Sequence, residues 1–528
     1  MLPRPAPRPR FGPFQPFWIP AADLVRSAAS VGAALALMAP LLTGLASKAH
    51  ALEHQTAPPP AANAKVPPRP TAAPATHRPQ LFHRVKNAHE QARMASYLKT
   101  RTPAAEHVKH SFVAEAGHTI DCVAVEHQPA MLRPELRGHT LLKPPPASFA
   151  PARALPGKGL AHAPKGYRAP AKPPAAATGL FFRGGTDAQR KSRACPQGTV
   201  PHARKTLEEL TAFATLEEYH SKLPRHLVRG RFASARKDPD GASERAAPTV
   251  DGGAVSSHDH AHVENQSLVN YGVHTVMSVI SAYVMVGHRE FSLSQLWLVA
   301  VDPVLGEQTL EAGIQSDPDR HHGDARPRFF AFSTTNGYQH YQDREWWKTH
   351  NGTSCYDLEC GQFVQVDPTF DFSAPVQPGE IDVAYVKYGE AWWLRVQNRW
   401  IGYYPASLYS EAGLRNRATT IDFGGEVVNN RDAAGHGHPN WHTTSGMGTG
   451  GFPEAAYPQA AYQRQLGYFA SADGKDLTPA HGLEVKAKKP GCYRASTPVE
   501  AFNFNPTWGT YFFFGGPGYS FTSDDCKL

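Results

Sequence analysis

Two short segments place a glutamate close to glycine in sequence that favours β-strands. The first is TLEAGIQ, which contains Glu311, and the second is IDFGGEVV, which contains Glu426. Side chains alternate between the two faces of a strand, so Glu311 should share its face with Gly313 and Gln315, and Glu426 with Gly424. A glycine beside a carboxylate removes a side chain that would fill a groove. We therefore predict that both glutamates line a groove that an extended chain can enter.

A pair of carboxyl groups in one partly desolvated groove can catalyse hydrolysis. Two like charges cannot both ionise cheaply, so the pKa of one group rises and the pair shares a proton. The ionised group can take a proton from water while the protonated group donates to the bond under attack. Glu311 and Glu426 are the candidate catalytic residues, and this chemistry needs no metal and no cofactor. The candidate groove residues are Gly313, Gln315, Gly424 and Gly425.

Two other functions fit the same features. A glycoside hydrolase also places two carboxyl groups across a scissile bond. A non-catalytic sandwich that binds wall peptide or glycan would use exposed aromatic rings, and the tryptophan pairs at 346–347 and 392–393 could supply them. Paired tryptophans more often pack in a core or at its rim.

The elements that must position these residues are strands. From about Val263 onward, apolar and polar residues alternate in segments such as FSLSQLWLVAVD, RFFAFSTTNG and TYFFFGGPG, with Gly, Pro, Asn and Asp between them. Only the segment at 455–467 is predicted to be helical. Many strands over this length predict an all-β domain, an antiparallel β-sandwich with Greek-key or jelly-roll connections, over residues 263–528.

Composition divides the rest of the chain. Residues 52–80 are rich in Pro and Ala and are predicted to be a linker, and residues 235–262 are polar without periodicity and are predicted to be a second, flexible linker. The segment from Leu81 to Thr102 has a helix-compatible pattern. The histidines of HDHAH and HGHPNWH are predicted to be solvated rather than metal ligands, because the composition around them is that of loops.

The N-terminus has the pattern of an export signal. Four arginines precede an apolar run at 28–46, and AHA at 49–51 has the small-x-small form of a signal-peptidase site. Pro40 and the many alanines make the run a poor membrane anchor. We predict a signal peptide over residues 1–51, secretion to an extracellular or periplasmic space, and no stable membrane association.

Charge and motifs exclude several classes of function. The formal net charge is +8, but many basic residues lie among prolines and alanines in the first half, so nucleic acid is not an expected partner. The chain lacks H-E-x-x-H, G-x-S-x-G and Walker signatures. GMGTGG at 446–451 fits a dinucleotide-binding spacing, but Phe-Pro follows it instead of a helix.

Export makes an even number of cysteines a candidate disulfide set. No metal-binding spacing occurs among the six. We predict three bonds between neighbours in sequence: Cys122–Cys195, Cys355–Cys360 and Cys492–Cys526.

An ordered series of blocks resembles the neprosin family of secreted glutamic peptidases. The blocks are EFSLSQLWLV, QTLEAGIQ, PRFFAFSTTNGYQ, CYDLECGQFVQVD, WWLRVQNRWIGYYPASLY, IDFGGEVV and MGTGGFPEAAYPQAAYQRQL, and they cover essentially all of 263–528. Upstream, IDCVAVEHQPAM and ACPQGTVPHARKT resemble the activation segment of that family. The resemblance implies that residues 81–234 form a propeptide in front of the peptidase domain.

The resemblance also carries expectations about function. The two catalytic glutamates of the family correspond to Glu311 and Glu426, and its fold is an antiparallel β-sandwich. Its members are made as zymogens, many cleave after proline, and they work at acidic pH. The implied partners are therefore a peptide or protein substrate, proline-rich by preference, and the chain's own propeptide as inhibitor. Ile314 stands where the family usually has Trp, and Gly451 where it usually has His, so either position could alter substrate preference.

Overall fold

The computed structural model describes residues 85, 87–146, 149, 162–220, 222, 256–284, 286–287, 289–338, 354–359, 361–430, 445–472, 474, 476–487, 489–518 and 526. The predicted signal peptide and first linker, residues 1–80, lie outside these ranges, and so does 235–255. None of the described helices is long and apolar enough to cross a membrane.

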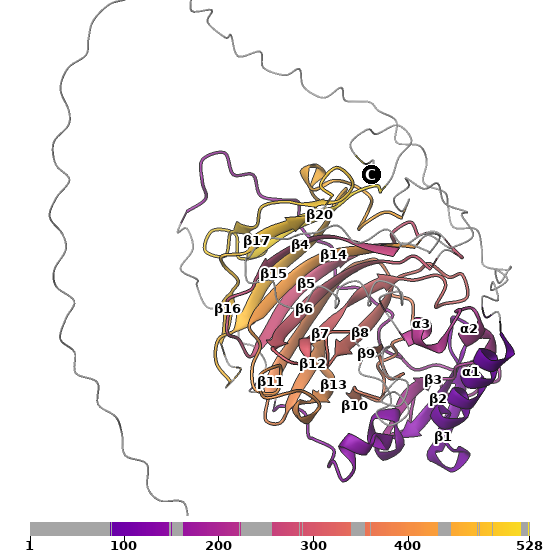
Figure 1. Ribbon diagram of the computed structural model, residues 1–528. Helices are drawn as coiled ribbons and strands as arrows, with labels where there is room; N and C mark the ends of the chain where they lie inside the picture. Colours follow the sequence, from indigo (N-terminus) through magenta and orange to yellow (C-terminus); the bar gives the residue numbers. More distant parts are fainter. Residues whose placement is uncertain are drawn as a thin grey trace, which may run out of the picture. The chain divides into compact units, whose positions relative to one another are not determined.

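Seventeen of the twenty strands of the described chain form two large antiparallel sheets, which confirms the all-β, sandwich-like fold (Figure 1). The first has ten strands, eight of them in the order β10-β13-β12-β11-β5-β15-β20-β18, with β16 beside β15 and β19 beside β20. Their bounds are β5 Gly272–Val279, β10 Val364–Gln365, β11 Gly379–Tyr388, β12 Ala391–Val396, β13 Arg399–Pro405, β15 Ala461–Phe469, β16 Leu477–Pro479, β18 Arg494–Ala495, β19 Val499–Glu500 and β20 Thr510–Gly515.

The second sheet carries both candidate glutamates. Its seven strands have the order β17-β4-β14-β6-β7-β8-β9. Their bounds are β4 Ser256–Asn265, β6 Ser292–Asp302, β7 Gly306–Ser316, β8 Arg328–Thr334, β9 Ser354–Tyr356, β14 Thr420–Asn430 and β17 Glu484–Ala487. Strand β6 therefore lies between β7, with Glu311, and β14, with Glu426.

The core of the sandwich forms between these sheets. Leu296 and Leu310 of the second sheet belong to the same buried cluster as Tyr385, Leu394 and Phe512 of the first. Burying one such side chain contributes roughly 1.5–3 kcal/mol. Many contributions of this size fix the register of the strands, because a slip by one residue would turn every core side chain outward.

A smaller N-terminal subdomain, residues 85–222 of the described chain, has a sheet of its own in the order β1-β2-β3. Its elements are α1 Ala88–Arg101, β1 Val108–Val113, β2 Thr119–Ala124, β3 Thr199–Ala203, α2 Leu207–Thr211 and α3 Leu216–His220. Helix α1 confirms the helical pattern seen in the sequence, and the Asn87 side chain caps it by accepting from the Glu90 backbone N at 2.6 Å. That this subdomain is a propeptide remains a prediction.

Two expectations from the sequence are wrong. The segment at 455–467 is not a helix, because from Ala461 it forms β15, which pairs with β5 and β20. Its alanines and glutamines favour a helix locally, but the two neighbouring strands take up its backbone hydrogen bonds. Strand β4 begins at Ser256, inside the range expected to be a flexible linker.

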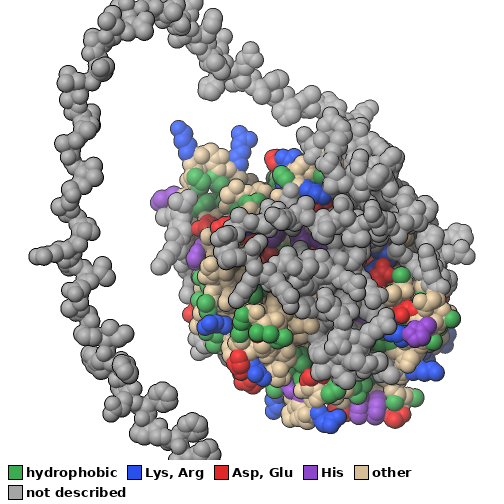
Figure 2. Space-filling view, viewed as in Figure 1, with side chains coloured by type: hydrophobic (Ala, Val, Ile, Leu, Met, Phe, Trp, Pro, Cys, Tyr) green, Lys and Arg blue, Asp and Glu red, His purple; other side chains and the backbone are tan. Residues whose placement is uncertain are grey.

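Two of the three predicted disulfides lie in the described chain, Cys122–Cys195 and Cys492–Cys526. Cys360 lies outside it, so the third stays a prediction. Trp392 and Trp393 are fully buried, which removes them as an exposed platform for glycans. The other tryptophan pair, at 346–347, lies outside the described residues. On the face seen in Figure 2, described Lys and Arg side chains are interspersed with Asp and Glu.

Candidate active site

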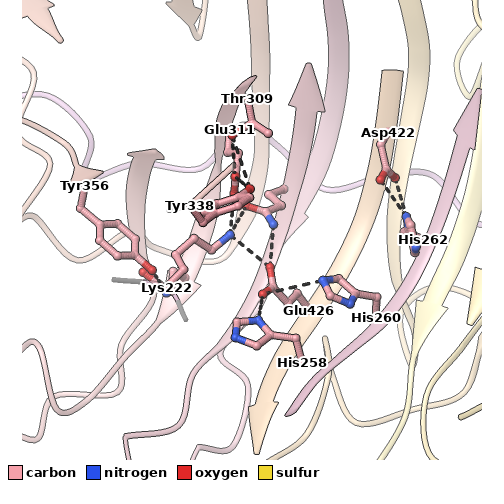
Figure 3. Close-up of polar contacts among 12 residues, drawn as sticks. Lys222, His258, His260, His262, Thr309, Glu311, Tyr338, Tyr356, Asp422 and Glu426 are labelled. Atoms are coloured by element: carbon pink, nitrogen blue, oxygen red, sulfur yellow. Dashed lines mark hydrogen bonds and ion pairs between the residues drawn. The ribbon is translucent and has the colours of Figure 1, made fainter. Parts of the chain in front are cut away.

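The register of the second sheet brings the two predicted glutamates to one face. Glu311 pairs with Trp297 on β6, and Glu426 pairs with Leu293 on the same strand. Gln295 lies midway between these two partners, so all of them point to the same side of the sheet. Figure 3 shows Glu311 and Glu426 on this face, and Gln295 Nε2 donates to Oε2 of Glu426 at 2.8 Å.

A lysine from the N-terminal subdomain lies between the two carboxylates. The Nζ of Lys222 is 2.6 Å from Oε2 of Glu311 and 3.1 Å from Oε2 of Glu426 (Figure 3). It also donates to Oε1 of Gln295 at 3.1 Å. All three ionisable side chains are buried, with exposed fractions of 6% for Lys222, 0% for Glu311 and 3% for Glu426. One ammonium thus occupies the centre of the glutamate pair.

Buried charges are tolerated only when they are paired, and this triad is paired closely. Burial raises the pKa of a carboxyl group, but Lys222 and His258 outweigh that effect and hold the pKa of Glu426 well below its usual value. Burial disfavours the ammonium in turn, yet the two carboxylates outweigh it and raise the pKa of Lys222. With Lys222 in place, Glu426 is therefore held ionised.

The two glutamates have different neighbours. Oε1 of Glu311 accepts from two hydroxyls, Thr309 Oγ1 at 2.9 Å and Tyr338 Oη at 2.6 Å. Glu426 contacts nitrogen atoms instead: Gln295 Nε2 donates to its Oε2 at 2.8 Å, and His258 Nδ1 contacts its Oε1. A hydroxyl can either donate or accept, whereas an amide NH₂ can only donate. The surroundings of Glu311 therefore tolerate a protonated carboxyl better than those of Glu426.

The candidate groove residues do not all line the site. A Cβ on Gly313 would collide with backbone atoms of β6, and one on Gly424 with His262 of β4. These two glycines allow close approach of the neighbouring strands rather than of a substrate. A Cβ on Gly425 would lie 2.6 Å from Phe514 and 2.7 Å from Met447, so Gly425 faces the core between the sheets.

Gln315, the fourth groove candidate, is buried and donates to Tyr356 Oη at 3.2 Å. Of the two departures from the family pattern, Ile314 belongs to the core cluster, so its side chain points away from the face that carries Glu311. A Cβ on Gly451 would collide with the backbone O of Gln459. Neither Ile314 nor Gly451 therefore contacts the glutamate pair.

Sequence reasoning missed several residues of the site. Lys222 lies 89 residues before Glu311 in an unremarkable segment, HSKLP, and no local pattern singles it out. Gln295, by contrast, lies in SLSQLW, where strand alternation could have placed a buried amide beside a glutamate. The histidines of HDHAH were expected in solvent, but His258 and His260 lie on β4 against Glu426.

The Neprosin family model matches residues 288–517, which include both glutamates. The fold and the family thus define a peptidase domain. Residues 288–517 therefore form a Neprosin domain, as the ordered sequence blocks predicted.

Several solved structures are similar to part of the chain. A scytalido-glutamic peptidase with a transition state analog inhibitor is 8% identical, with a TM-score of 0.28, over 49% of this chain and 98% of that one. SCP-B, a member of the eqolisin family of peptidases, is 8% identical, with a TM-score of 0.26, over 50% and 100%. CG-16, a homodimeric agglutinin from chicken liver, is 11% identical, with a TM-score of 0.18, over 32% and 99%.

Proposed function

We propose that this protein is a secreted glutamic endopeptidase made as a zymogen, which cleaves peptide bonds after proline at acidic pH with the pair Glu311 and Glu426. The observation that carries the proposal is the Lys222 ammonium, which contacts both carboxylates from the N-terminal subdomain. A propeptide that inhibits a pair of carboxylates needs a cation at this place. The preference for proline rests on the resemblance to the family alone.

When the Lys222 ammonium leaves the site, the glutamate pair can take up the single proton that catalysis requires. Two carboxylates this close lose their shared counter-charge when the ammonium leaves, so the pKa of one must rise and the pair takes up a proton. The hydroxyls of Thr309 and Tyr338 make Glu311 the group that accommodates this proton. Glu426, among nitrogen donors, stays ionised.

Each group then has one task. Glu426 accepts a proton from a bound water as the water oxygen attacks the carbonyl carbon of the peptide, and Glu311 donates its proton to the carbonyl oxygen. The tetrahedral intermediate collapses when the C–N bond breaks: the leaving nitrogen takes the proton that Glu426 holds, and one hydroxyl of the intermediate returns a proton to Glu311 as the carboxylic acid forms. Gln295, between the two groups, donates to Glu426 and orients it.

Acid also loosens the contact that holds the N-terminal subdomain. His118 and His202 of this subdomain and His321 of the sandwich are half-buried around one cavity or its rim. Burial lowers the pKa of all three, that of His202 to about 4. The charged groups that act on them are Asp121, Lys205, Glu209, Arg320, Arg328, Glu359 and Asp371.

The sign of the pH effect follows from these lowered pKa values. The docked form keeps the three histidines neutral, whereas exposed histidines take up protons near pH 6.5. Docking is therefore most stable above pH 6.5 and weakens as the pH falls toward 4. A fall in pH would then both withdraw Lys222 from the site and protonate the glutamate pair.

The test compares two lysines that each form an ion pair between the N-terminal subdomain and the sandwich. Lys222 contacts the glutamate pair, and Lys205 contacts Glu359 at 3.3 Å, away from it. We expect the full-length Lys222→Met protein to lose the N-terminal segment and to hydrolyse a proline-containing peptide at a pH at least one unit higher than the wild type. Mass spectrometry follows both events across pH 7 to 4.

Lys205→Met is the matched control, and it should shift release less than Lys222→Met does. Equal shifts would mean that Lys222 is an ordinary docking contact, and no shift in either would contradict inhibition by the N-terminal subdomain. Products also decide between reaction classes: hydrolysis of glycans without peptide products would favour the glycoside hydrolase, and no product from either would favour a binding sandwich.

A further inference from the structure

We propose that His258, His260 and Glu426 form a binding site for a zinc-like transition-metal ion, and that the ion inhibits the enzyme. The His258 and His260 side chains come from one face of β4, and Glu426 pairs with His260 across the β4–β14 ladder. The composition around HDHAH predicts solvated histidines. The structure instead places two of its imidazoles on a catalytic candidate.

The three side chains converge on a small volume. His258 Nδ1 contacts Oε1 of Glu426, and His260 Nε2 lies 3.7 Å from the same oxygen (Figure 3). One ligand atom from each residue lies within 4.8 Å of the other two. A zinc ion with bonds of about 2.0–2.2 Å separates its ligand atoms by roughly 3.3–3.5 Å. His260 and Glu426 already have nearly this spacing, so binding needs only a small separation of His258 from Glu426.

The donor set selects the class of metal. Two imidazoles and one carboxylate, with a fourth position open, suit Zn²⁺, Cu²⁺ and Ni²⁺. Magnesium prefers oxygen ligands in an octahedron and should bind poorly here.

Neighbouring residues hold the ligands in place. Phe291 packs edge-on against the His258 ring, and Trp297 lies beside His260. Gln295 fixes the second oxygen of Glu426. Such outer contacts reduce the motion that a ligand must lose on binding a metal. The Nε2 of His258 is buried and contacts no polar atom of the described residues, so Glu426 is the polar partner that the described chain gives this ring.

Lys222 opposes the metal because its ammonium lies 3.1 Å from Oε2 of Glu426, the other oxygen of the same carboxylate. A divalent cation on Oε1 would face this charge at close range. The site should therefore bind weakly while Lys222 is docked and tightly once the charge is gone. A metal on Glu426 would in turn prevent that carboxylate from accepting a proton from water. Only this inhibition rests on the proposed function; binding does not.

The experiment titrates full-length protein with Zn²⁺ at pH 7 by calorimetry, and with Co²⁺ for its visible spectrum, using Mg²⁺ as the control ion. We expect one Zn²⁺ per Lys222→Met protein, bound at least tenfold more tightly than by the wild type. The double variant Lys222→Met, His260→Gln should bind Zn²⁺ at least tenfold more weakly than Lys222→Met alone. His481→Gln, which changes an exposed imidazole outside the site, should leave binding unchanged.

Glu426→Gln in the Lys222→Met protein gives a second test, in case His260→Gln disturbs the strand. Three results would overturn the proposal. The Lys222→Met protein does not bind Zn²⁺, or neither His260→Gln nor Glu426→Gln weakens its binding, or His481→Gln weakens binding as much as these two substitutions do. The proposed function fails separately: if the acid-processed protein binds Zn²⁺ at the pH of the assay but its hydrolysis is not inhibited there, the metal site stands and the catalytic role of Glu426 falls.

Discussion

The two-sheet sandwich and the N-terminal subdomain are stabilised by different means. The sandwich has one large apolar cluster that draws on both sheets. The subdomain has small clusters, such as the one around Met94 and Phe213, and a disulfide that joins β2 to a distant loop. Their mutual contact contains ion pairs, including Lys205 with Glu359, and half-buried histidines such as His202. Apolar burial changes little with pH, whereas ion pairs and histidines respond strongly to it. This difference is what the proposed release of the N-terminal subdomain in acid requires.

The largest effect is expected inside the sandwich, at the glutamate pair. Glu311→Gln and Glu426→Gln each keep the shape of the side chain but remove its acid–base function. Peptide hydrolysis should fall by about 10³-fold or more in either variant, and the double variant should lose little beyond that, because the two groups act as a unit. Initial rates with acid-treated protein measure this, and circular dichroism checks the fold. Near-normal turnover in either variant would refute the pair.

A smaller effect is expected in the subdomain when its disulfide is removed. Cys122 and Cys195 are 73 residues apart, and loss of such a bond destabilises a small domain by about 2–5 kcal/mol. The Cys122→Ser, Cys195→Ser protein should therefore lose protection against proteolysis in residues 85–222 first. The comparison is Cys492→Ser, Cys526→Ser, which removes a bond from the better-packed sandwich. If proteolysis began in the same region in both double variants, the proposed difference in how the subdomain and the sandwich are stabilised would be wrong.

The smallest effect concerns one histidine of the contact. Burial lowers the pKa of His202 to about 4, so this imidazole takes up a proton more readily after the subdomain is released than before. Acid therefore favours release, and His202→Gln removes this contribution. Half-release of the N-terminal segment should move to lower pH by about half a unit, read as mass against pH. His481→Gln is the control, since that imidazole is exposed. A shift to higher pH would reverse the assigned sign.

Strand patterns predicted the sandwich well because they are local. The alternation in FSLSQLWLVAVD corresponds to β6, Ser292–Asp302, and the two glutamates do share one face. The glycine argument was less reliable, because the neighbouring strands rather than an open groove fill the space beside Gly313 and Gly424. The helix expected at 455–467 failed for a related reason: pairing with β5 and β20 outweighs the local preference.

The sequence by itself determined the all-β class, the strands that carry Glu311 and Glu426, the disulfide Cys122–Cys195 and the Neprosin domain over residues 288–517. Each of these can be predicted from local periodicity, from residue spacing or from an ordered set of motifs. Only the tertiary structure decided which cation lies on the glutamate pair. Lys222 and Glu426 are 204 residues apart, and their ion pair depends on how a whole subdomain docks. The same holds for His258, because its partner lies on a neighbouring strand 168 residues away, and no local pattern encodes which strands become neighbours.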